Sequence, residues 1–167
     1  MALMEVLKFP NPVLRKKCEK VETVDEEIKK IARDMAETMY AENGIGLAAP
    51  QVGITKRIFV VDVDDELITV INPEITISGE KVKMEEGCLC LPEVTVEIER
   101  LSDVQLKGLD IDGKEISIEA GDLLARALQH ETDHLNGMLI IDHLSKVKRD
   151  MVVKKFRKLQ LKKNEEE

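Results

Sequence analysis

Hydrophobic and polar residues alternate with a period of two in the middle of the chain. Residues 94–100 (VTVEIER) alternate strictly, and residues 103–119 (DVQLKGLDIDGKEISIE) do so again, as strands with one buried face do. The Asp112-Gly113 pair between two alternating runs is a strong signal for a hairpin. These segments predict antiparallel β-sheet.

Shorter runs upstream predict further extended chain. Residues 57–63 (RIFVVDV) and 67–72 (LITVIN) are rich in β-branched side chains, which favour strands. Residues 81–92 (KVKMEEGCLCLP) continue the extended pattern and should end at Pro92. Residues 44–53 (GIGLAAPQVG) consist mostly of small residues, and a loop is expected there; turn statistics alone explain this run equally well as a plain turn.

Three segments repeat apolar residues with the spacing of a helix. Asp25 can cap a helix that runs to about Glu42, before the Asn-Gly pair at 43 and 44. Residues 121–137 predict a largely apolar helix inside the fold. A last helix, from about Ser145 to Lys163, has lysines on most sides and these apolar residues on one side: Val147, Met151, Val152, Phe156, Leu159 and Leu161. The whole pattern predicts an α+β protein.

The composition is that of a soluble globular protein. The 167 residues have the length of one ordinary domain, so we expect one catalytic domain over residues 1–167. Hydrophobic residues make up 43% of the chain and charged residues 35%. No run approaches the roughly 18 apolar residues of a membrane span, and three cysteines make a disulfide framework improbable. We therefore expect a cytoplasmic protein without a membrane partner.

The charge is uneven along the chain. Nine Lys or Arg and one acid, Asp150, give residues 146–163 a net charge of +8, so the remainder carries −16 of the total of −8. Only this basic segment is expected to meet a polyanion; a solvated helix face is an equally good explanation. Aromatic residues are 2% of the chain, which argues against a base-stacking surface, and no DNA partner is expected.

The segment QHETDHLNG, residues 129–137, carries the clearest chemical signal. His130 and His134 are four apart on a predicted helix, so both imidazoles can reach one ion from the same face. Glu131 follows the first histidine, in the H-E-x-x-H order in which a glutamate handles protons on a metal-bound water. The alternative is a pair of histidines at a helix surface. The apolar neighbours favour a metal site.

Two histidines leave the site incomplete, and the third ligand has to be found elsewhere. Position 140 is Ile, where one metalloprotease class has a further histidine, and no glutamate lies about twenty residues downstream. His143 lies beyond the predicted helix end and is expected at the surface or behind the ligands. A thiolate from Cys88 or Cys90 would give a His2Cys set with a position open to water. Residues two apart on a strand face the same side, so spacing does not choose between them.

Three motifs together resemble those of bacterial peptide deformylases: GIGLAAPQVG at 44–53, EGCLCLP at 86–92 and QHETDHLNG at 129–137. The likeness extends from FPNPVLRK near the start through the C-terminal helix. It implies a fold in which antiparallel sheets enclose the central H-E-x-x-H helix, with an N-terminal helix and a basic C-terminal helix.

The resemblance also implies roles for single residues. Cys88, His130 and His134 would hold the metal, and Glu131 would be the general base and acid while a metal-bound hydroxide attacks a formyl carbonyl. Gln51 and the backbone N–H of Leu89 would stabilise the oxyanion. One divalent ion is expected, Fe(II) in the cell, with Zn, Ni or Co in purified protein.

The expected substrate is a nascent polypeptide that begins with formyl-methionine, and the expected products are formate and a free amine. Its backbone would pair with Ile45 and Gly46, with Gly44 and Gly46 allowing close approach. The methionine slot would be lined by Met84, Leu123 and Ala127, with Glu86 and Gly87 at its rim. The basic C-terminal helix resembles an element by which some deformylases dock on the ribosome.

The chain departs from the family pattern at two positions. The motif normally reads E-G-C-L-S, and here Cys90 replaces the serine, which brings a second thiol near the metal. An arginine follows the motif in many members, whereas Thr95 lies near that position here. Two rival functions remain: a metallopeptidase that cleaves internal bonds, which the cysteine ligand disfavours, and a nonenzymatic ribosome-associated factor with a structural metal.

Overall fold

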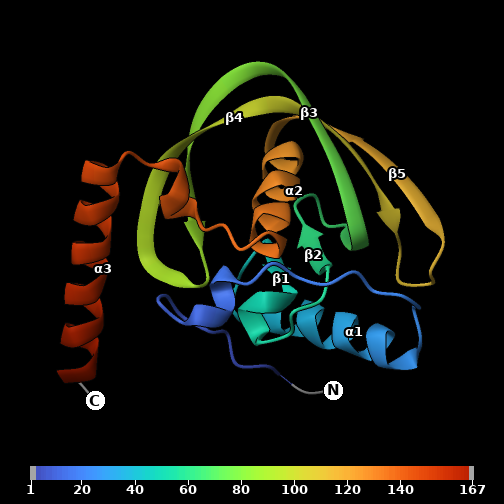
Figure 1. The fold of residues 1–167 in the computed structure, drawn as a ribbon, viewed down its shortest axis with the longest axis horizontal. Helices are drawn as coiled ribbons and strands as arrows, with labels where there is room; N and C mark the ends of the chain where they lie inside the picture. The colour runs from blue at the N-terminus through green and yellow to red at the C-terminus, as the bar shows by residue number, and fades with distance from the viewer. Residues whose placement is uncertain (1–2, 166–167) are drawn as a thin grey trace.

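The computed structural model describes residues 3–165, whose strands form one antiparallel sheet (Figure 1). Every strand pairs with its neighbours in sequence, in the order β1-β2-β3-β4-β5. The strands are β1 (Gly46–Ala48), β2 (Ile58–Asp62), β3 (Leu67–Cys88), β4 (Leu91–Leu109) and β5 (Glu115–Ala120). The predicted hairpin at Asp112-Gly113 is confirmed, because β4 and β5 meet there and Gly113 has a φ of +78°.

The strands β3 and β4 are much longer than the sequence predicted. They contain 22 and 19 residues and form an arch over the helix at the centre of the molecule (Figure 1). Their register shifts three times, between Ile71 and Glu74, between Ser78 and Lys81, and at Cys88. Such bulges bend a strand pair and increase its twist. These bends allow the β3–β4 pair to curve around α2.

The expectation that the extended segment ends at Pro92 was wrong. The strand β3 ends at Cys88, and Pro92 lies near the start of β4. Pro92 is tolerated because it falls in the irregular stretch at the third register shift, where the regular pairing of the two strands is interrupted. The sequence also predicted a loop at 44–53, but this segment contains the edge strand β1 and a short 3-10 helix, Ala49–Val52.

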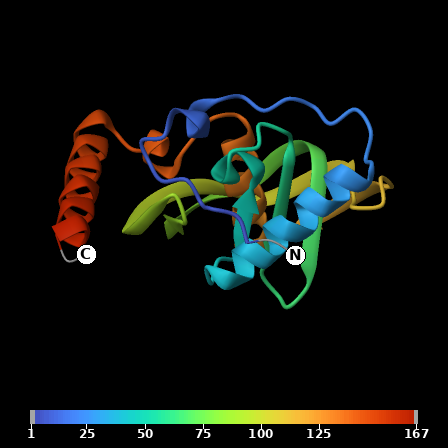
Figure 2. The same cartoon turned by 90° about the horizontal axis from the view of Figure 1, so that it is seen from below.

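The N-terminal helix forms as predicted. Helix α1 (Glu26–Ala41) is capped by Asp25, whose side chain accepts a hydrogen bond from the Ile28 N–H at 3.0 Å. One face of α1 is buried against β1 and β2 through Ile28, Ala32, Met35 and Met39. The helix packs on the sheet from the side opposite the arch (Figure 2).

The helix α2 (Asp122–Leu135) lies at the centre of the fold, as the apolar pattern predicted. Nine of its 14 residues are buried. Its Leu128 and Leu135 join a core cluster with Phe59, Val70 and Leu106 from three strands. The chain leaves α2 through Gly137, where φ is +76° and a side chain would collide with the backbone of Arg15. The fold class predicted from the sequence is therefore confirmed.

The helix α3 (Lys146–Glu165) lies beside the rest of the molecule (Figures 1 and 2). It is anchored by Phe156, which is 2% exposed and meets the Phe9 ring edge to face at 6.0 Å. Val152 and Leu159 are partly buried as predicted, but Val147, Met151 and Leu161 are 72%, 66% and 64% exposed. These three residues of the predicted apolar face are thus exposed and do not pack against the core. Within residues 3–165 no helix has the length and apolar character needed to cross a bilayer.

Candidate metal centre and active site

Three potential metal ligands converge where β3 ends against the C-terminal half of α2. The Sγ of Cys88 lies 3.2 Å from the Nε2 of His134, and that nitrogen lies 3.2 Å from the Nε2 of His130. One ligand atom from each of the three residues falls within 4.8 Å of the others. Two N or S atoms bound to one tetrahedral zinc-like ion are about 3.4 Å apart, given metal–ligand distances of about 2.0–2.3 Å. The residues therefore fit a single metal ion.

The structure separates the two cysteines that the sequence left as alternatives. The sulfur of Cys88 lies with both imidazoles, and Cys88 lines a cavity. Cys90 is fully buried, and its sulfur lies 3.2 Å from that of Cys88 but outside the three-residue group. The Cys90 thiol and burial raise the pKa of Cys88 to about 11. A bound cation would act in the opposite direction.

Glu86 contacts His130 through the ring nitrogen that does not face the other ligands. Its Oε1 lies 2.9 Å from the Nδ1 of His130, and its Oε2 accepts hydrogen bonds from Arg100 Nε and Arg126 NH1, each at 2.6 Å. Burial acts against the charge of Glu86, but the hydrogen bonds from His130 and Arg100 hold its pKa well below the ordinary value. The carboxylate thus fixes the ring so that its Nε2 faces the other ligands, as partners of metal-binding histidines do.

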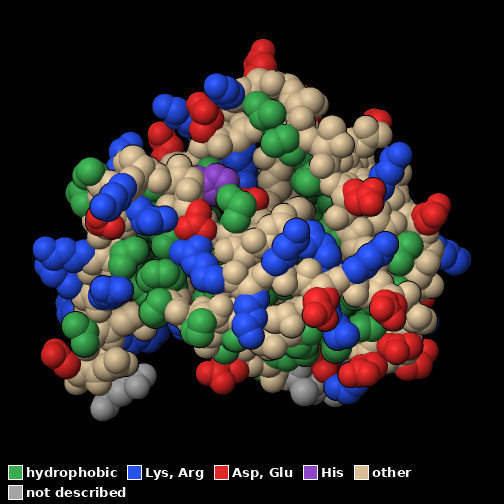
Figure 3. Space-filling view, in the orientation of Figure 1, with side chains coloured by type: hydrophobic (Ala, Val, Ile, Leu, Met, Phe, Trp, Pro, Cys, Tyr) green, Lys and Arg blue, Asp and Glu red, His purple; other side chains and the backbone are tan. Residues whose placement is uncertain are grey.

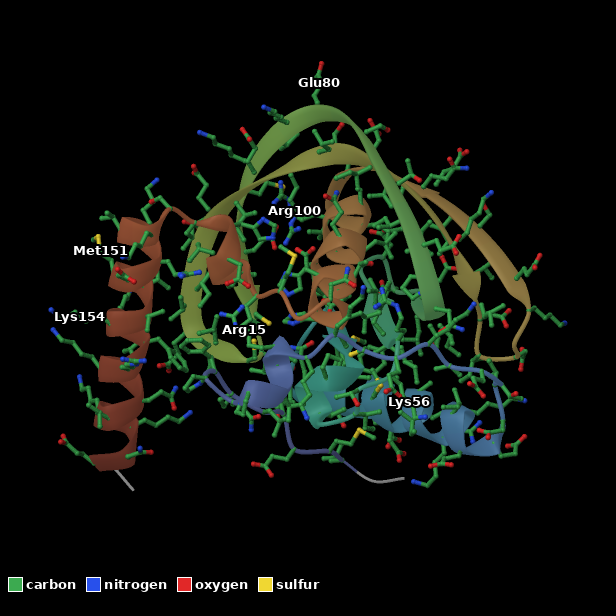
Figure 4. The ribbon with its side chains drawn as sticks, in the orientation of Figure 1. Arg15, Lys56, Glu80, Arg100, Met151 and Lys154 are labelled. Atoms are coloured by element: carbon green, nitrogen blue, oxygen red, sulfur yellow. The ribbon has the colours of Figure 1, made fainter. Side chains whose placement is uncertain are left out.

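The hydrogen-bonded network extends from Arg100 to Asp133 and His143. Arg100, which lies between α2 and the arch (Figure 4), also donates from NH1 to Asp133 Oδ2 at 2.9 Å. The same Asp133 oxygen lies 2.8 Å from the Nε2 of His143. Burial works against the charged form of Asp133, but His143 and Arg100 lower its pKa. His143 lies outside the three-residue ligand group and is exposed, which is the surface position that the sequence left open for it.

Glu131 is a buried carboxylate beside the ligands. It is 4% exposed, its Oε2 lies 3.9 Å from His130 Nε2, and its Oε1 has no hydrogen-bond partner among the described residues. Burial raises the pKa of Glu131 to about 7. Gly46 lies directly against this carboxylate, because a Cβ at that position would collide with the Glu131 side chain. An oxygen left without a partner in a cavity is available to a water or a substrate.

Gln51 is held against the same sulfur. Its Oε1 accepts from the Ala48 N–H at 2.8 Å, and its Nε2 donates to Cys88 Sγ at 3.4 Å. This residue is 1% exposed and reaches the site from the 3-10 helix that follows β1. Leu89, the other residue expected at the oxyanion, lines the cavity beside Cys88.

The cavity has a volume of about 680 Å³ and contains most of the residues expected to bind substrate. It is lined by Gly44, Ile45, Gly46, Glu86, Gly87, Leu123 and Ala127, together with Cys88, Leu89, His130 and Glu131. Met84, which we expected in the methionine slot, is 40% exposed and does not line it. Leu91 and Val94 supply further apolar wall.

Comparisons with known proteins agree with this geometry. The family model described as polypeptide deformylase matches residues 3–150. The chain belongs to the peptide deformylase family. A peptide deformylase of Thermodesulfovibrio yellowstonii is 52% identical over 162 residues, which cover 94% of this chain and 98% of that protein. One of Chromohalobacter salexigens is 49% identical, covering 95% of each.

Solved deformylase structures share the whole fold. A crystal structure of the peptide deformylase from Legionella pneumophila has a TM-score of 0.93 and 41% identity, covering 98% of both chains. The enzyme from Ehrlichia chaffeensis in complex with actinonin has a TM-score of 0.91 and 43% identity, covering 95% of this chain and 98% of that chain. The chain is thus a peptide deformylase by family, and the resemblance found in the three motifs is confirmed.

Sequence reasoning missed the two arginines that hold Glu86. We expected Glu86 only at the rim of the substrate slot, and we assigned no role to Arg100 or Arg126. Both arginines left a signal in the sequence. Arg126 interrupts an apolar helix one turn before His130. Arg100 ends the alternating run at 94–100, at a position on the buried side in step with Val94, Val96 and Ile98. A charged residue at a buried position implies an opposite charge nearby.

Proposed function

We propose that this protein removes the N-formyl group from the methionine that begins a newly made polypeptide, and so releases formate and a free amine. The observation that carries the proposal is the buried, unpartnered oxygen of Glu131 beside three converging metal ligands in a family of deformylases. The reaction would take place in the cytoplasm, in one catalytic domain spanning residues 1–167.

Cys88, His130 and His134 would hold one divalent ion. Their surroundings favour a positive charge: although burial disfavours protonation of His130, the Glu131 and Glu86 carboxylates and the Cys88 sulfur raise its pKa well above the ordinary value. Such an ion supplies a Lewis acid that activates water near neutral pH and polarises the formyl carbonyl. The proposed ion is Fe(II) in the cell, with Zn, Ni or Co in purified protein, because thiolate and imidazole suit these metals.

Glu131 would carry the proton. Its free oxygen accepts a proton from the attacking water, and the same carboxyl then delivers it to the nitrogen that leaves with the peptide. A carboxyl with a pKa of about 7 in the metal-free protein can do both near neutral pH. Glu131 projects from α2, and its side chain lies directly against Gly46.

Gln51 and the Leu89 N–H would stabilise the oxyanion. The Gln51 Nε2 is anchored through its own Oε1, so the amide is already oriented toward the sulfur at the cavity wall. A donor that needs no reorganisation gives the largest benefit, and the loss of one such donor costs on the order of a hundredfold in rate.

The peptide would bind as an added strand. The strand β1 lies at the edge of the sheet, where β2 is its one partner among the strands of residues 3–165, and Ile45 and Gly46 line the cavity beside that edge. A free strand edge recruits an extended peptide by main-chain hydrogen bonds. The methionine side chain would enter between Gly87, Leu123 and Ala127, with the apolar Leu91 and Val94 beyond them.

Formate release decides among the three functions. Protein purified anaerobically is incubated with formyl-Met-Ala-Ser, and formate and new amine are both measured. Equal amounts of the two products support deformylation. Cleavage between Met and Ala would indicate the metallopeptidase, and no product from a metal-loaded protein would indicate the structural metal site.

The basic helix α3 would dock on ribosomal RNA. Its four central cations, Lys154, Lys155, Arg157 and Lys158, are all exposed, and several Lys and Arg side chains lie over α3 at the left of Figure 3. Lys154 points away from the rest of the protein (Figure 4). Contacts of lysine and arginine with phosphate weaken steeply as salt rises.

Removing α3 would also remove the buried Phe156, so a charge-reversal variant gives the cleaner test. The four cations are changed to Glu, and ribosome sedimentation is compared with that of a matched variant in which Lys16, Lys17, Lys20 and Lys83 are reversed. Loss of binding only in the α3 variant supports docking. Equal binding by the wild type and both variants would contradict it.

A further inference from the structure

Two thiols lie next to each other at the end of β3, and only one of them has a part in the proposed reaction. The sulfurs of Cys88 and Cys90 are 3.2 Å apart. A disulfide bond is about 2.05 Å long, so the two atoms need to approach by about 1.2 Å. The third cysteine, Cys18, is buried in a different core cluster.

We propose that Cys90 is a resolving thiol, so that oxidation of Cys88 by hydrogen peroxide ends in a reversible Cys88–Cys90 disulfide. The inference rests on the positions of the two sulfurs and not on the deformylation reaction. It concerns the chain without its metal, in which no ion covers the Cys88 sulfur. Cys90 replaces the serine that the family motif usually carries, and a serine has no sulfur with which to close such a bond.

The two cysteines differ in access. Cys88 lines the 680 Å³ cavity, which a small oxidant can enter. Cys90 is fully buried and does not line the cavity. Peroxide therefore meets Cys88 first, and Cys90 is reached only from within the protein.

The chemistry balances in two steps. The Cys88 thiol and one peroxide molecule give a Cys88 sulfenic acid and one water, as an S–O bond forms and the O–O bond breaks. The Cys90 thiol then attacks the Cys88 sulfur, the S–O bond breaks, and a second water leaves. The two sulfurs together supply the two electrons that reduce the peroxide.

The neighbours of Cys88 leave Cys90 as the reaction partner. The other groups around its sulfur include the Nε2 of His134 at 3.2 Å, the Nε2 of Gln51 at 3.4 Å and the His130 ring. None of these is a thiol. Cys90 lies in the two-residue turn between β3 and β4, beside a register shift, and its carbonyl accepts a hydrogen bond from the Phe9 N–H at 2.9 Å. The backbone is thus held while the side chain rotates.

The consequence is protection of a ligand sulfur. Without a resolving thiol, a sulfenic acid goes on to sulfinic and sulfonic acids, which thiol reductants do not reverse. With Cys90 beside it, the oxidation stops at a bond that dithiothreitol reduces. The oxidised chain should lose one of its three metal ligands and regain it on reduction.

The test uses the full chain, freed of metal by a chelator and treated with hydrogen peroxide. Intact mass and the number of free thiols after denaturation are measured for the wild type, Cys90→Ser and Cys18→Ser. The wild type and Cys18→Ser should each lose two thiols and about 2 Da, and dithiothreitol should restore both quantities. Uptake of Ni(II), measured by metal analysis, should fall after oxidation and recover after reduction.

The variant Cys90→Ser should behave differently. Its Cys88 should gain oxygen in steps of about 16 Da, and dithiothreitol should not remove the sulfinic and sulfonic products. The proposal is overturned if the wild type gains oxygen on Cys88 as this variant does, if the bridge involves Cys18, or if two chains become linked to each other. Each of these results is visible by mass, whether or not the protein releases formate.

Discussion

The helices α2 and α3 differ most in burial: α2 is enclosed by the fold, and α3 lies on its surface. Nine of the 14 residues of α2 are buried, whereas Phe156 is the buried residue among the 20 of α3. Arg126 and His130 of α2 point into the molecule, where both are paired with Glu86 of β3. Met151 and Lys154 of α3 point away from the protein (Figure 4). Chemistry that depends on position lies on the enclosed helix, and the charged surface lies on the exposed one.

The largest difference between the two helices should appear when a charged residue is replaced by methionine. Arg126→Met removes hydrogen bonds to Glu86 at 2.6 Å and to two backbone carbonyls. Breaking a buried ion pair costs about 3–5 kcal/mol of the free energy of unfolding, and loss of support for a metal-binding histidine lowers metal affinity about 10–100-fold. Urea unfolding and metal competition measure the two effects.

Lys154→Met on α3 is the matched control. Its side chain is exposed, so the free energy of unfolding should change by less than about 0.5 kcal/mol. Equal losses for the two variants would contradict the division between the helices.

The next effect concerns how α3 is attached. Phe156→Ala removes the ring that packs against Phe9, and should lower the free energy of unfolding by about 3 kcal/mol. Met151→Ala, at a residue that is 66% exposed, should have little effect. The rate of formate release per folded molecule should stay the same in both variants, because α3 supplies no residue to the cavity lining. A loss of rate in fully folded Phe156→Ala protein would show that α3 also shapes the site.

A smaller effect separates two glycines of the same cavity. Gly46→Ala would push a Cβ into the Glu131 side chain. Displacement of a reacting group by about 1 Å can cost on the order of a hundredfold in rate, and the metal content should not change. At Gly87 an added Cβ would meet its nearest atom at 3.6 Å, an ordinary contact. Gly87→Ala should therefore lose much less in kcat than Gly46→Ala, and the reverse order would refute the role given to Glu131.

The smallest effect should come from the hydrogen bond at the C-terminal end of α1. Tyr40 donates to Asp62 at 2.5 Å, and this bond raises the pKa of Tyr40 to about 12. Because the folded pKa lies above the ordinary 10, the bond contributes stability below pH 10 that is lost as the pH rises through 12. The tyrosine is 48% exposed, so Tyr40→Phe should cost less than about 1 kcal/mol at pH 8. Urea unfolding at pH 8 and pH 11 measures whether the difference shrinks.

The sequence predicted the helices better than the strands. The caps and stops of α1 and α2 are local signals, and Asp25 and Gly137 act as predicted. The strands β3 and β4 were predicted in pieces, because bulges interrupt the alternation where the ribbon bends. A bulge depends on how two strands pair with each other, so the residues of one strand alone do not reveal it.

The candidate site shows the same division. The pair His130 and His134 could be predicted from spacing on one helix, but the choice of Cys88 over Cys90 needed either the family resemblance or the coordinates. Met84 lies outside the cavity, and Val147 is exposed. Neither could be predicted, because burial of an apolar side chain depends on whether another part of the fold packs against it. An apolar pattern shows which face could be covered, and only the tertiary structure shows what covers it.

The most direct test of the account measures metal content and formate release in one anaerobic preparation of the wild type and Glu131→Gln. The substitution keeps the size of the side chain and removes its ability to take up a proton. We predict that both proteins bind one metal ion per chain and that only the wild type releases formate from formyl-Met-Ala-Ser at an appreciable rate. Wild-type turnover by metal-loaded Glu131→Gln would contradict the central claim that this carboxylate carries the proton.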